Sequence, residues 1–521
     1  MENRSAKQIY HSLEGKRYNY IERARTCSKL TLPYIMPEAG FGGSSKTLTP
    51  FASIAARGVN NLASKLLLAL LPPNAPFFRL NVDTYSLKAE GAPDDIVSTI
   101  ESGLQQVEEA VMDEISGTSY RASLHEALKH LIVTGNALIY MPKEGGMRVF
   151  HLDRYVVDRD PMGNVTHIAT QENISRNALS PELSGMIPED ASSSATNSDL
   201  ELYTACCLMD NKWHVFQDIN GIRIPGSEGV FKKDRNPYIP LRFSLVSGES
   251  YGRSYVEEYL GDVQSLESLT RAIVEGSSAA AKVLFMVNPN GTTRARTLAE
   301  SENGAITQGN ANDISVLQLN KFNDFRVAQE TMNSIKDRLG HAFLLTSGVV
   351  RNAERVTAEE IRMLSMELES SLGGLYSLLS SELQLPMVTR LMEVMGKKKS
   401  LPDLPKDVIN PVIITGVEAL GRGNDLQKLD MFLAGANQVV GQQAVSQFVN
   451  VAEYFKRRAT SLGIKTPGLI KTQEEIQAEM TSQQEQTLLE KSAPSGVSAL
   501  SQQMLQQRQH EVEGQVEESE E

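Results

Sequence analysis

The sequence predicts an α+β chain that is mainly helical and divided into several domains. Its 521 residues correspond to several domains at roughly 100 to 200 residues each. Apolar residues recur at helical spacing in the first 135 residues and again beyond about 254. Short runs rich in β-branched and aromatic residues occupy the part between. Helices therefore flank a β-rich segment.

Composition and charge narrow the function classes. The chain is 41% hydrophobic and 22% charged, as soluble globular proteins are. A formal net charge of −13 argues against a surface that grips nucleic acid, because phosphate contacts need clustered Lys and Arg. Nucleic acid as a passing cargo stays compatible with it. The cysteines, Cys27, Cys206 and Cys207, include no CxxC pair and favour packed thiols in a reducing compartment.

The first 135 residues predict packing helices. The N-terminus lacks the apolar core of a signal peptide. The most apolar run, LASKLLLALLPP at 62–73, contains Lys65 and ends in two prolines. It is shorter than the roughly 20 residues that span a bilayer, so we expect a buried helix and no membrane partner. A second amphipathic run covers 94–116.

The part after Gly135 predicts strands. ALIYMP, MRVFHL, YVVDRD and NVTHIAT are typical of an antiparallel meander. Strands are expected again in LELYTACCLM, KWHVFQDI and YIPLRFSLV. The segment 180–199 between the two groups is rich in Ser, Pro and acidic residues and predicts a mobile surface loop.

Two long helices are expected next, with a small αβ insert between them. The first covers 254–282 behind Ser254 as N-cap, and the second covers 322–345. At 1.5 Å per residue they would be roughly 40 and 36 Å long. The insert, 283–321, combines strand-like and helical runs. The two helices are therefore expected to form an antiparallel hairpin.

The segment 346–356, TSGVVRNAERV, follows the second long helix. Thr357 and Glu360 form a T-x-x-E capping box, which predicts that a third long helix starts there. Gly373, Gly374 and Pro386 should bend or break this helix. A strand in NPVIITGVEAL and helices to about 480 are expected beyond it, and the acidic tail 481–521 predicts disorder.

The sequence contains no convincing catalytic motif. HEALKH at 125–130 places His125 and His130 five residues apart, whereas a zinc protease helix needs four, so no metal is expected. No GxxxxGK[ST] phosphate loop occurs, and GRGND at 421 lacks the pattern of a dinucleotide fingerprint. No cysteine is nominated as a nucleophile. We expect no enzymatic activity and no cofactor.

Four stretches resemble one protein family: ARGVNNLASKLLLALLP at 56–72, GESYGRSYVEEYLGDVQSLE at 248–267, ERVTAEEIR at 354–362 and LSSELQLPMV at 379–388. They are similar to the portal proteins, or head-to-tail connectors, of short-tailed bacteriophages of the autographivirus type. The resemblance covers about residues 5–480 and leaves out the acidic tail and the loop at 180–199.

The resemblance implies a ring, usually a dodecamer, at one capsid vertex of the virion. Double-stranded DNA passes through its channel during packaging and ejection. Its expected partners are terminase, major capsid and scaffold proteins and tail adaptor proteins, with assembly in the host bacterial cytoplasm.

The implied phage portal fold has a wing, a two-helix stem, a small αβ clip and a helical crown. On this sequence the divisions would be wing 1–253, stem helix 254–282, clip 283–321, stem helix 322–345, tunnel loop 346–356, wing 357–420, crown 421–480 and flexible tail 481–521.

Candidate site residues follow from these divisions. Val349 and Val350 would form an apolar constriction, and Arg351 and Arg355 would touch phosphates weakly. An acidic stem lining would repel DNA, with candidates Glu257, Glu258, Asp262 and Glu267. The loop assignments each have an alternative: Arg355 pairs with Glu359, Arg351 is an ordinary surface residue, and the valines pack between subunits.

Two other functions stay open at this point. One is a metal- or thiol-dependent hydrolase built around His125, His130 or Cys206. The other is a monomeric tail or scaffold component, which would share the helices without needing the helix-insert-helix arrangement.

Overall fold

The structure is a computed structural model. It describes residues 4–37, 49–72, 77–81, 94–175, 200–280, 284–302, 304–317, 322–345, 358–372, 374–397, 412–415 and 422–441, together with 449, 454, 455 and 458. The loop expected at 180–199, the tail 481–521 and most of 442–480 lie outside these residues. The chain forms two compact units, Met1–Leu420 and Gly421–Glu521, and each is described by itself.

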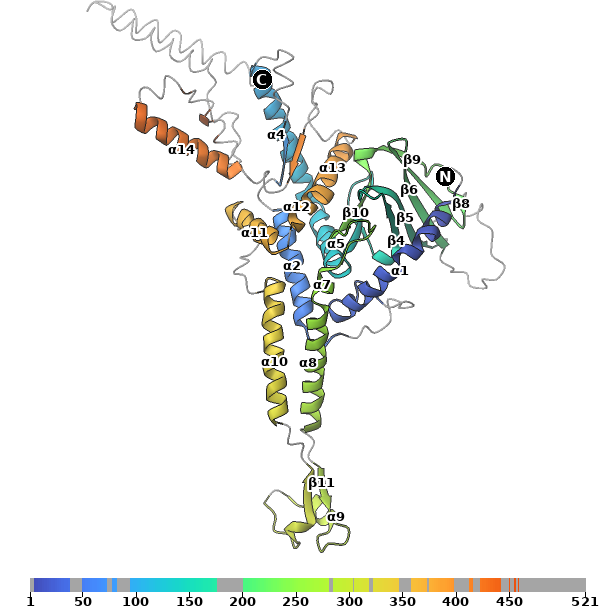
Figure 1. Cartoon of the computed structure of the whole chain (residues 1–521), viewed down its shortest axis with the longest axis vertical. Coiled ribbons are helices and arrows are strands. Elements are labelled where there is room, and N and C mark those ends of the chain that lie inside the picture. The colour runs from blue at the N-terminus through green and yellow to red at the C-terminus, as the bar shows by residue number, and fades with distance from the viewer. Residues whose placement is uncertain are drawn as a thin grey trace, which may run out of the picture. The chain divides into compact units, whose positions relative to one another are not determined.

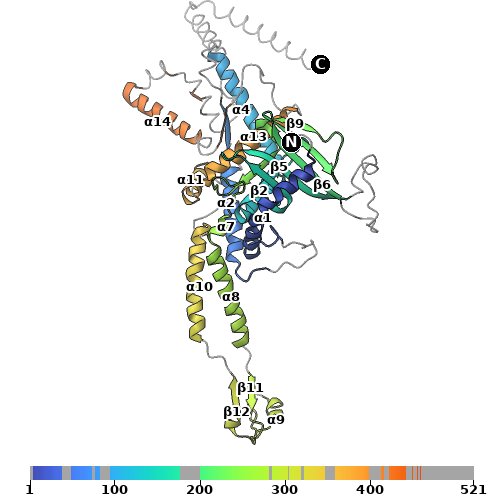
Figure 2. The same cartoon turned by 45° about the vertical axis from the view of Figure 1, so that its right-hand side comes forward.

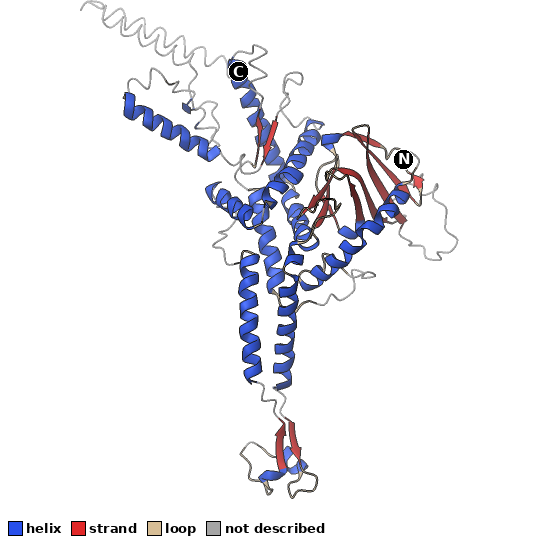
Figure 3. Ribbon diagram, in the orientation of Figure 1, coloured by secondary structure: helices blue, strands red, loops and turns tan. Residues whose placement is uncertain are grey.

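The fold class is confirmed, since the described residues mix helix and strand and helix predominates (Figure 3). The N-terminal helices are α1 (Ala6–Leu30), α2 (Ile54–Leu70), α4 (Asp94–Gly117) and α5 (Tyr120–Thr134). The apolar run at 62–73 is indeed a buried helix, because Leu62, Leu66 and Leu70 of α2 are fully buried. Among the helices that the structure describes, none has the length and apolarity that a membrane crossing needs.

The strands form two sheets in the region where the sequence predicts a meander. The larger antiparallel sheet contains β4 (Tyr155–Arg159), β5 (Val165–Ile174), β6 (Leu200–Met209), β7 (Lys212–Ile219), β8 (Ile222–Arg223) and β9 (Gly229–Lys232). The smaller sheet pairs β2 (Asn136–Tyr140) with β3 (Arg148–Phe150) and with β10 (Tyr238–Arg242). The strands pair antiparallel as predicted, but β2 and β3 belong to a different sheet from β4 and β5, and the short helix η1 (Leu152–Arg154) lies between the two pairs.

Helix α1 packs against the larger sheet through a buried arginine (Figure 1). It begins behind a capping box in which Ser5 and Gln8 exchange hydrogen bonds. Arg17 is 2% exposed and donates hydrogen bonds to the carbonyls of Leu152, at 2.9 Å, and Tyr155, and to the Tyr10 hydroxyl at 3.0 Å. Arg17 therefore joins α1 to the chain at the start of β4.

The two long helices are α8 (Leu260–Ala280) and α10 (Phe322–Ala342), and the four-residue helix α7 (Tyr255–Glu258) precedes α8. Ser254 caps α7 as predicted, since its hydroxyl accepts a hydrogen bond from the Glu257 amide. The single helix expected over 254–282 is interrupted at Tyr259. At 21 residues each, α8 and α10 are roughly 32 Å long.

Contacts along their length show that α8 and α10 run antiparallel, as expected. Asp262 pairs with Arg338 at 2.7 Å, and the Thr270 hydroxyl lies 3.6 Å from the Met332 sulfur. Further along, a Cβ added to Gly276 would lie 2.7 Å from the ring of Phe325. Residue numbers rise in one helix as they fall in the other, and Figures 1 and 2 both show the helices side by side.

The insert between these helices contains β11 (Leu284–Val287), α9 (Ala295–Ala299), η4 (Ala311–Asp313) and β12 (Ile314–Leu317) (Figure 2). The two strands are antiparallel and pair Leu284 with Leu317. The carboxylate of Asp313 accepts hydrogen bonds from the amides of Thr292 and Thr293 at 2.8 and 3.2 Å. This carboxylate braces the turn after β11.

The helix expected after Thr357 is divided into α11 (Ala358–Ser371), α12 (Leu375–Leu379), η6 (Ser380–Gln384) and α13 (Leu385–Lys397). A break falls at Gly374, whose φ of 88° favours glycine. At Pro386 the chain stays helical, and the π-helical turn η6 precedes the proline. Downstream, β13 (Val412–Thr415) pairs with β1 (Phe78–Asn81), and the second unit contains α14 (Arg422–Val440).

Replacing Arg17 tests the link between α1 and the sheet. Arg17→Met would leave buried carbonyls unpaired and lower the free energy of unfolding by about 3 kcal/mol. Lys16→Met is the matched control, because Lys16 is exposed and its ion pair with Asp158 contributes little. Calorimetric unfolding measures both variants. Equal midpoints for the two would refute this role of Arg17.

Candidate functional site

The predicted loop residues Val349, Val350, Arg351 and Arg355 lie outside the described residues, as does Thr357. The structure describes both flanks of the loop. On one side α10 ends at Ala342 and the chain continues to Leu345, and on the other side α11 begins at Ala358, the residue after Thr357. Both flanks pack against α2.

The α10 flank is held by two side chains of α2. The Asn61 amide donates hydrogen bonds to the carbonyls of Phe343 and Leu344, at 3.1 and 3.0 Å. The Lys65 ammonium donates to the same Leu344 carbonyl at 3.1 Å. Asn61 and Lys65 are four residues apart and so share one face of α2. They satisfy carbonyls that the end of a helix leaves without partners.

Leu344 itself has an unusual backbone. Its φ of 53° lies in the left-handed region, which a branched side chain rarely adopts. Such a conformation persists where surrounding contacts hold it. Here the hydrogen bonds from Asn61 and Lys65 hold the turn two residues before the undescribed loop.

Lys65 is a buried amine with 2% exposure. Burial lowers the pKa of Lys65, and the Glu367 carboxylate of α11 acts in the opposite direction. Lys65 therefore binds the α10 flank through a hydrogen bond and interacts electrostatically with the α11 flank. One side chain of α2 is coupled to both sides of the loop.

Close packing fixes the same flank. Phe343 is fully buried, and a Cβ added to Gly58 of α2 would lie 2.5 Å from its Cγ. The Tyr255 ring meets Phe343 edge to face at 5.6 Å, and its hydroxyl donates to the Ala342 carbonyl at 2.7 Å. The end of α10 is therefore wedged between α2 and α7.

The α11 flank is anchored by packing. Leu368 is fully buried in the hydrophobic core that also contains Leu62 and Leu66 of α2. A cleft of about 460 Å³ lies next to the break between α11 and α12. Its lining includes Tyr255, Glu258 and Leu375.

Sequence reasoning missed Gly58, Asn61 and Lys65 as anchoring residues. All three lie in ARGVNNLASKLLLALLP, one of the stretches that carry the family resemblance. Two signals were present: a glycine inside a helix, and a lysine inside the most apolar run of the chain. Neither signal predicts which residues Asn61 and Lys65 contact, because the carbonyls that they bind lie about 280 positions further along the chain.

The structure gives three of the four predicted stem carboxylates partners within the same chain. Glu257 lies 3.6 Å from Arg23 and from Arg253, and Asp262 pairs with Arg338. Glu267 accepts hydrogen bonds from the amides of Phe51 and Ala52, just before α2.

Glu258, the fourth carboxylate, lines the cleft, where partial desolvation and the neighbouring Glu257 raise the pKa of its carboxyl group. Whether these four residues line a tunnel stays a prediction.

The residues of the hydrolase alternative do not form a thiol centre. All three cysteines are free and buried. Burial raises the pKa of Cys206 well above its usual range and that of Cys27 and Cys207 to about 11, whereas a nucleophilic cysteine needs a lowered value. The cysteines are therefore packed thiols, as predicted.

The two histidines of HEALKH have different neighbours. His125 contacts the Ser64 hydroxyl at 3.3 Å, whereas the His130 ring meets that of His151 at 4.5 Å. Burial, with His151 beside it, lowers the pKa of His130 to about 3.

In this site, α2 and the residues just before it hold α8, the end of α10 and the start of the chain after the undescribed loop. A family profile described as "Bacteriophage head to tail connecting protein" matches residues 3–470. The portal protein of Escherichia phage T7 is 39% identical over 509 residues, which cover 96% of this chain and 94% of that protein.

Two further relatives agree. The portal protein of Enterobacteria phage T3 is 40% identical over 94% of this chain and 92% of its own length, and that of Enterobacteria phage SP6 is 28% identical over 96% and 97%. A solved chain from the virion of a native gene transfer agent particle covers 79% of this chain and 90% of its own length at 10% identity. Its TM-score of 0.34 is too low to support a conclusion.

The chain belongs to the bacteriophage head to tail connecting protein family. The predicted resemblance is confirmed. A protein of this family is a structural component of the virion and not an enzyme.

Gly58→Ala tests the wedge at the loop flank. The added methyl group overlaps Phe343, so we expect a loss of about 1 to 3 kcal/mol in the free energy of unfolding. Gly15→Ala in α1 is the control, because no described residue lies within 4 Å of the added Cβ and alanine favours a helix by up to about 1 kcal/mol. Denaturant unfolding should shift in opposite directions, and an unchanged Gly58→Ala midpoint would contradict the wedge.

Proposed function

We propose that this chain assembles into a ring of twelve copies at one capsid vertex, through which double-stranded DNA is packaged and ejected. Its partners would be terminase, capsid and scaffold proteins and tail adaptor proteins, and the ring would assemble in the host cytoplasm. Family membership supports this proposal, because the relatives are portal proteins that match over nearly their whole length.

We assign the regions of a portal subunit to the helices and strands of this chain. We assign α8 and α10 to the stem, the insert from β11 to β12 to the clip, and 346–356 to the tunnel loop. The elements before α7 and those from α11 to β13 would form the wing, and α14 the start of the crown. Under this assignment α2 connects the wing to the stem and to the tunnel loop.

One observation carries the mechanism: both flanks of the loop are anchored on α2, and α2 is also tied to the stem. Glu267 of α8 binds the backbone before α2, while Asn61 and Lys65 of α2 bind the end of α10. In a closed ring, identical copies would present this loop around one axis. Every loop would then emerge from a rigid base.

Weak contact with DNA follows from the charges. Each Lys or Arg that neutralises a phosphate adds salt-dependent affinity, and the loop contains only Arg351 and Arg355. Asp262 and Glu257 already have arginine partners, so the stem would repel DNA less than four free carboxylates would. With only two basic side chains in each loop, duplex DNA would still slide past with little retention.

Electron micrographs of the purified chain, combined with Arg351→Ala, test the proposal. We expect end-on views of rings for the wild type and the variant alike, and phage particles carrying Arg351→Ala should package or retain less DNA. The reason is that the substitution removes one phosphate contact per subunit from the loop.

Arg223→Ala is the control, because Arg223 lies on β8, outside the stem and the loop, and is 42% exposed. A stable monomer in dilute buffer would contradict the ring. Normal genome filling and release in the Arg351→Ala particles would contradict the role of the loop.

A further inference from the structure

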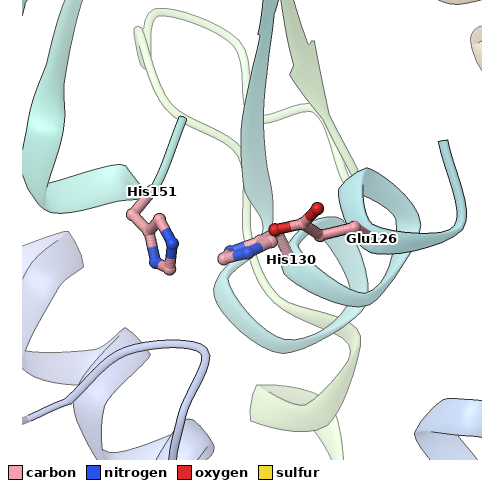
Figure 4. Close-up of side chains that lie close together, drawn as sticks. All are labelled: Glu126, His130 and His151. Atoms are coloured by element: carbon pink, nitrogen blue, oxygen red, sulfur yellow. The ribbon is translucent and has the colours of Figure 1, made fainter. Parts of the chain in front are cut away.

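Three side chains with metal-ligating atoms meet outside the site described above. Glu126, His130 and His151 each offer one ligand atom, and these atoms all lie within 4.8 Å of one another. Glu126 and His130 are one helical turn apart on α5, while His151 comes from the residue before η1. Figure 4 shows the imidazole of His130 between the Glu126 carboxylate and the His151 ring.

His130 has an unsatisfied nitrogen at this place. Its side chain is 2% exposed, and its Nδ1 has no hydrogen-bond partner among the residues that the structure describes. Buried polar atoms in folded proteins nearly always have a partner. An unpaired ring nitrogen next to two other potential ligands is therefore an observation that points to a missing group.

The second histidine is already oriented as a ligand. Nδ1 of His151 lies 3.0 Å from the carbonyl oxygen of Ile35. A carbonyl only accepts hydrogen bonds, so Nδ1 carries the proton and the lone pair of Nε2 stays available. Metal-binding histidines in proteins commonly donate their other ring nitrogen to a backbone carbonyl in this way.

The donor set selects the kind of metal. Two imidazoles and one carboxylate suit Zn²⁺ and similar transition ions, whereas Mg²⁺ and Ca²⁺ prefer oxygen ligands alone. Tetrahedral Zn²⁺ with bonds of about 2.1 Å places its ligand atoms roughly 3.4 Å apart. The exposed Glu126 carboxylate is free to move inward by the remaining distance.

We propose that Glu126, His130 and His151 bind one Zn²⁺ ion per subunit. The ion would join α5 to the turn before η1, and through Ile35 to the segment that follows α1. Three protein ligands leave a coordination position for water. The expectation that the chain holds no metal rested on the five-residue spacing of His125 and His130. In the folded chain the second histidine beside His130 is His151, which comes from a different segment, and not His125.

Calorimetric titration of the full-length chain, treated with a chelator and then with ZnCl₂, tests the proposal. The wild type should bind one equivalent of Zn²⁺ per subunit, and Glu126→Gln should weaken this binding at least tenfold. Because Glu126 is exposed, the substitution leaves the core intact. His125→Gln, next to Glu126 but outside the cluster, is the control and should bind as the wild type does.

Co²⁺ provides a second readout. Bound in place of Zn²⁺, it should give the visible absorption of a tetrahedral site in the wild type and lose it in Glu126→Gln. Absence of stoichiometric Zn²⁺ uptake by the wild type would overturn the proposal. Uptake that Glu126→Gln leaves unchanged would overturn it equally.

Discussion

The hydrogen bonds between α2 and the end of α10 are the constraint on which the loop depends. The last carbonyls of a helix have no partner within it, and an unpaired buried carbonyl is costly. Asn61 and Lys65 supply the partners for Phe343 and Leu344. Since α11 packs against the same helix, the two flanks cannot move independently of α2.

A buried lysine is well suited to this position. Burial disfavours its charged form, so the ammonium is tolerated only where acceptors and an opposite charge surround it. The Leu344 carbonyl and the Glu367 carboxylate supply these on opposite flanks of the loop. The aliphatic part of the Lys65 side chain is buried, while its ammonium group reaches the Leu344 carbonyl just before the loop.

Local signals in the sequence predicted much of the fold, whereas long-range partners could not be predicted. Ser254 as a cap, Gly374 as a break and the two antiparallel long helices each follow from residue type and spacing. The pairing of β2 with β10 joins segments about 100 residues apart, and the hydrogen bonds from the Phe51 and Ala52 amides to Glu267 depend on how α8 meets the chain before α2. The sequence therefore predicted which residues form the loop, whereas the residues of α2 that anchor it were found only in the structure.

Hydrogen-exchange mass spectrometry of the purified protein tests the central claim most directly. Asn61→Ala should speed exchange about tenfold in the segment 343–345 and leave the first turns of α10 unchanged, because two hydrogen bonds at this flank of the loop are lost. The control is Asn60→Ala, since within the part of the chain that the structure describes the Asn60 side-chain amide donates to the Ala56 carbonyl of its own helix and not to the loop flank. Unchanged exchange in the segment 343–345 of Asn61→Ala would contradict the account.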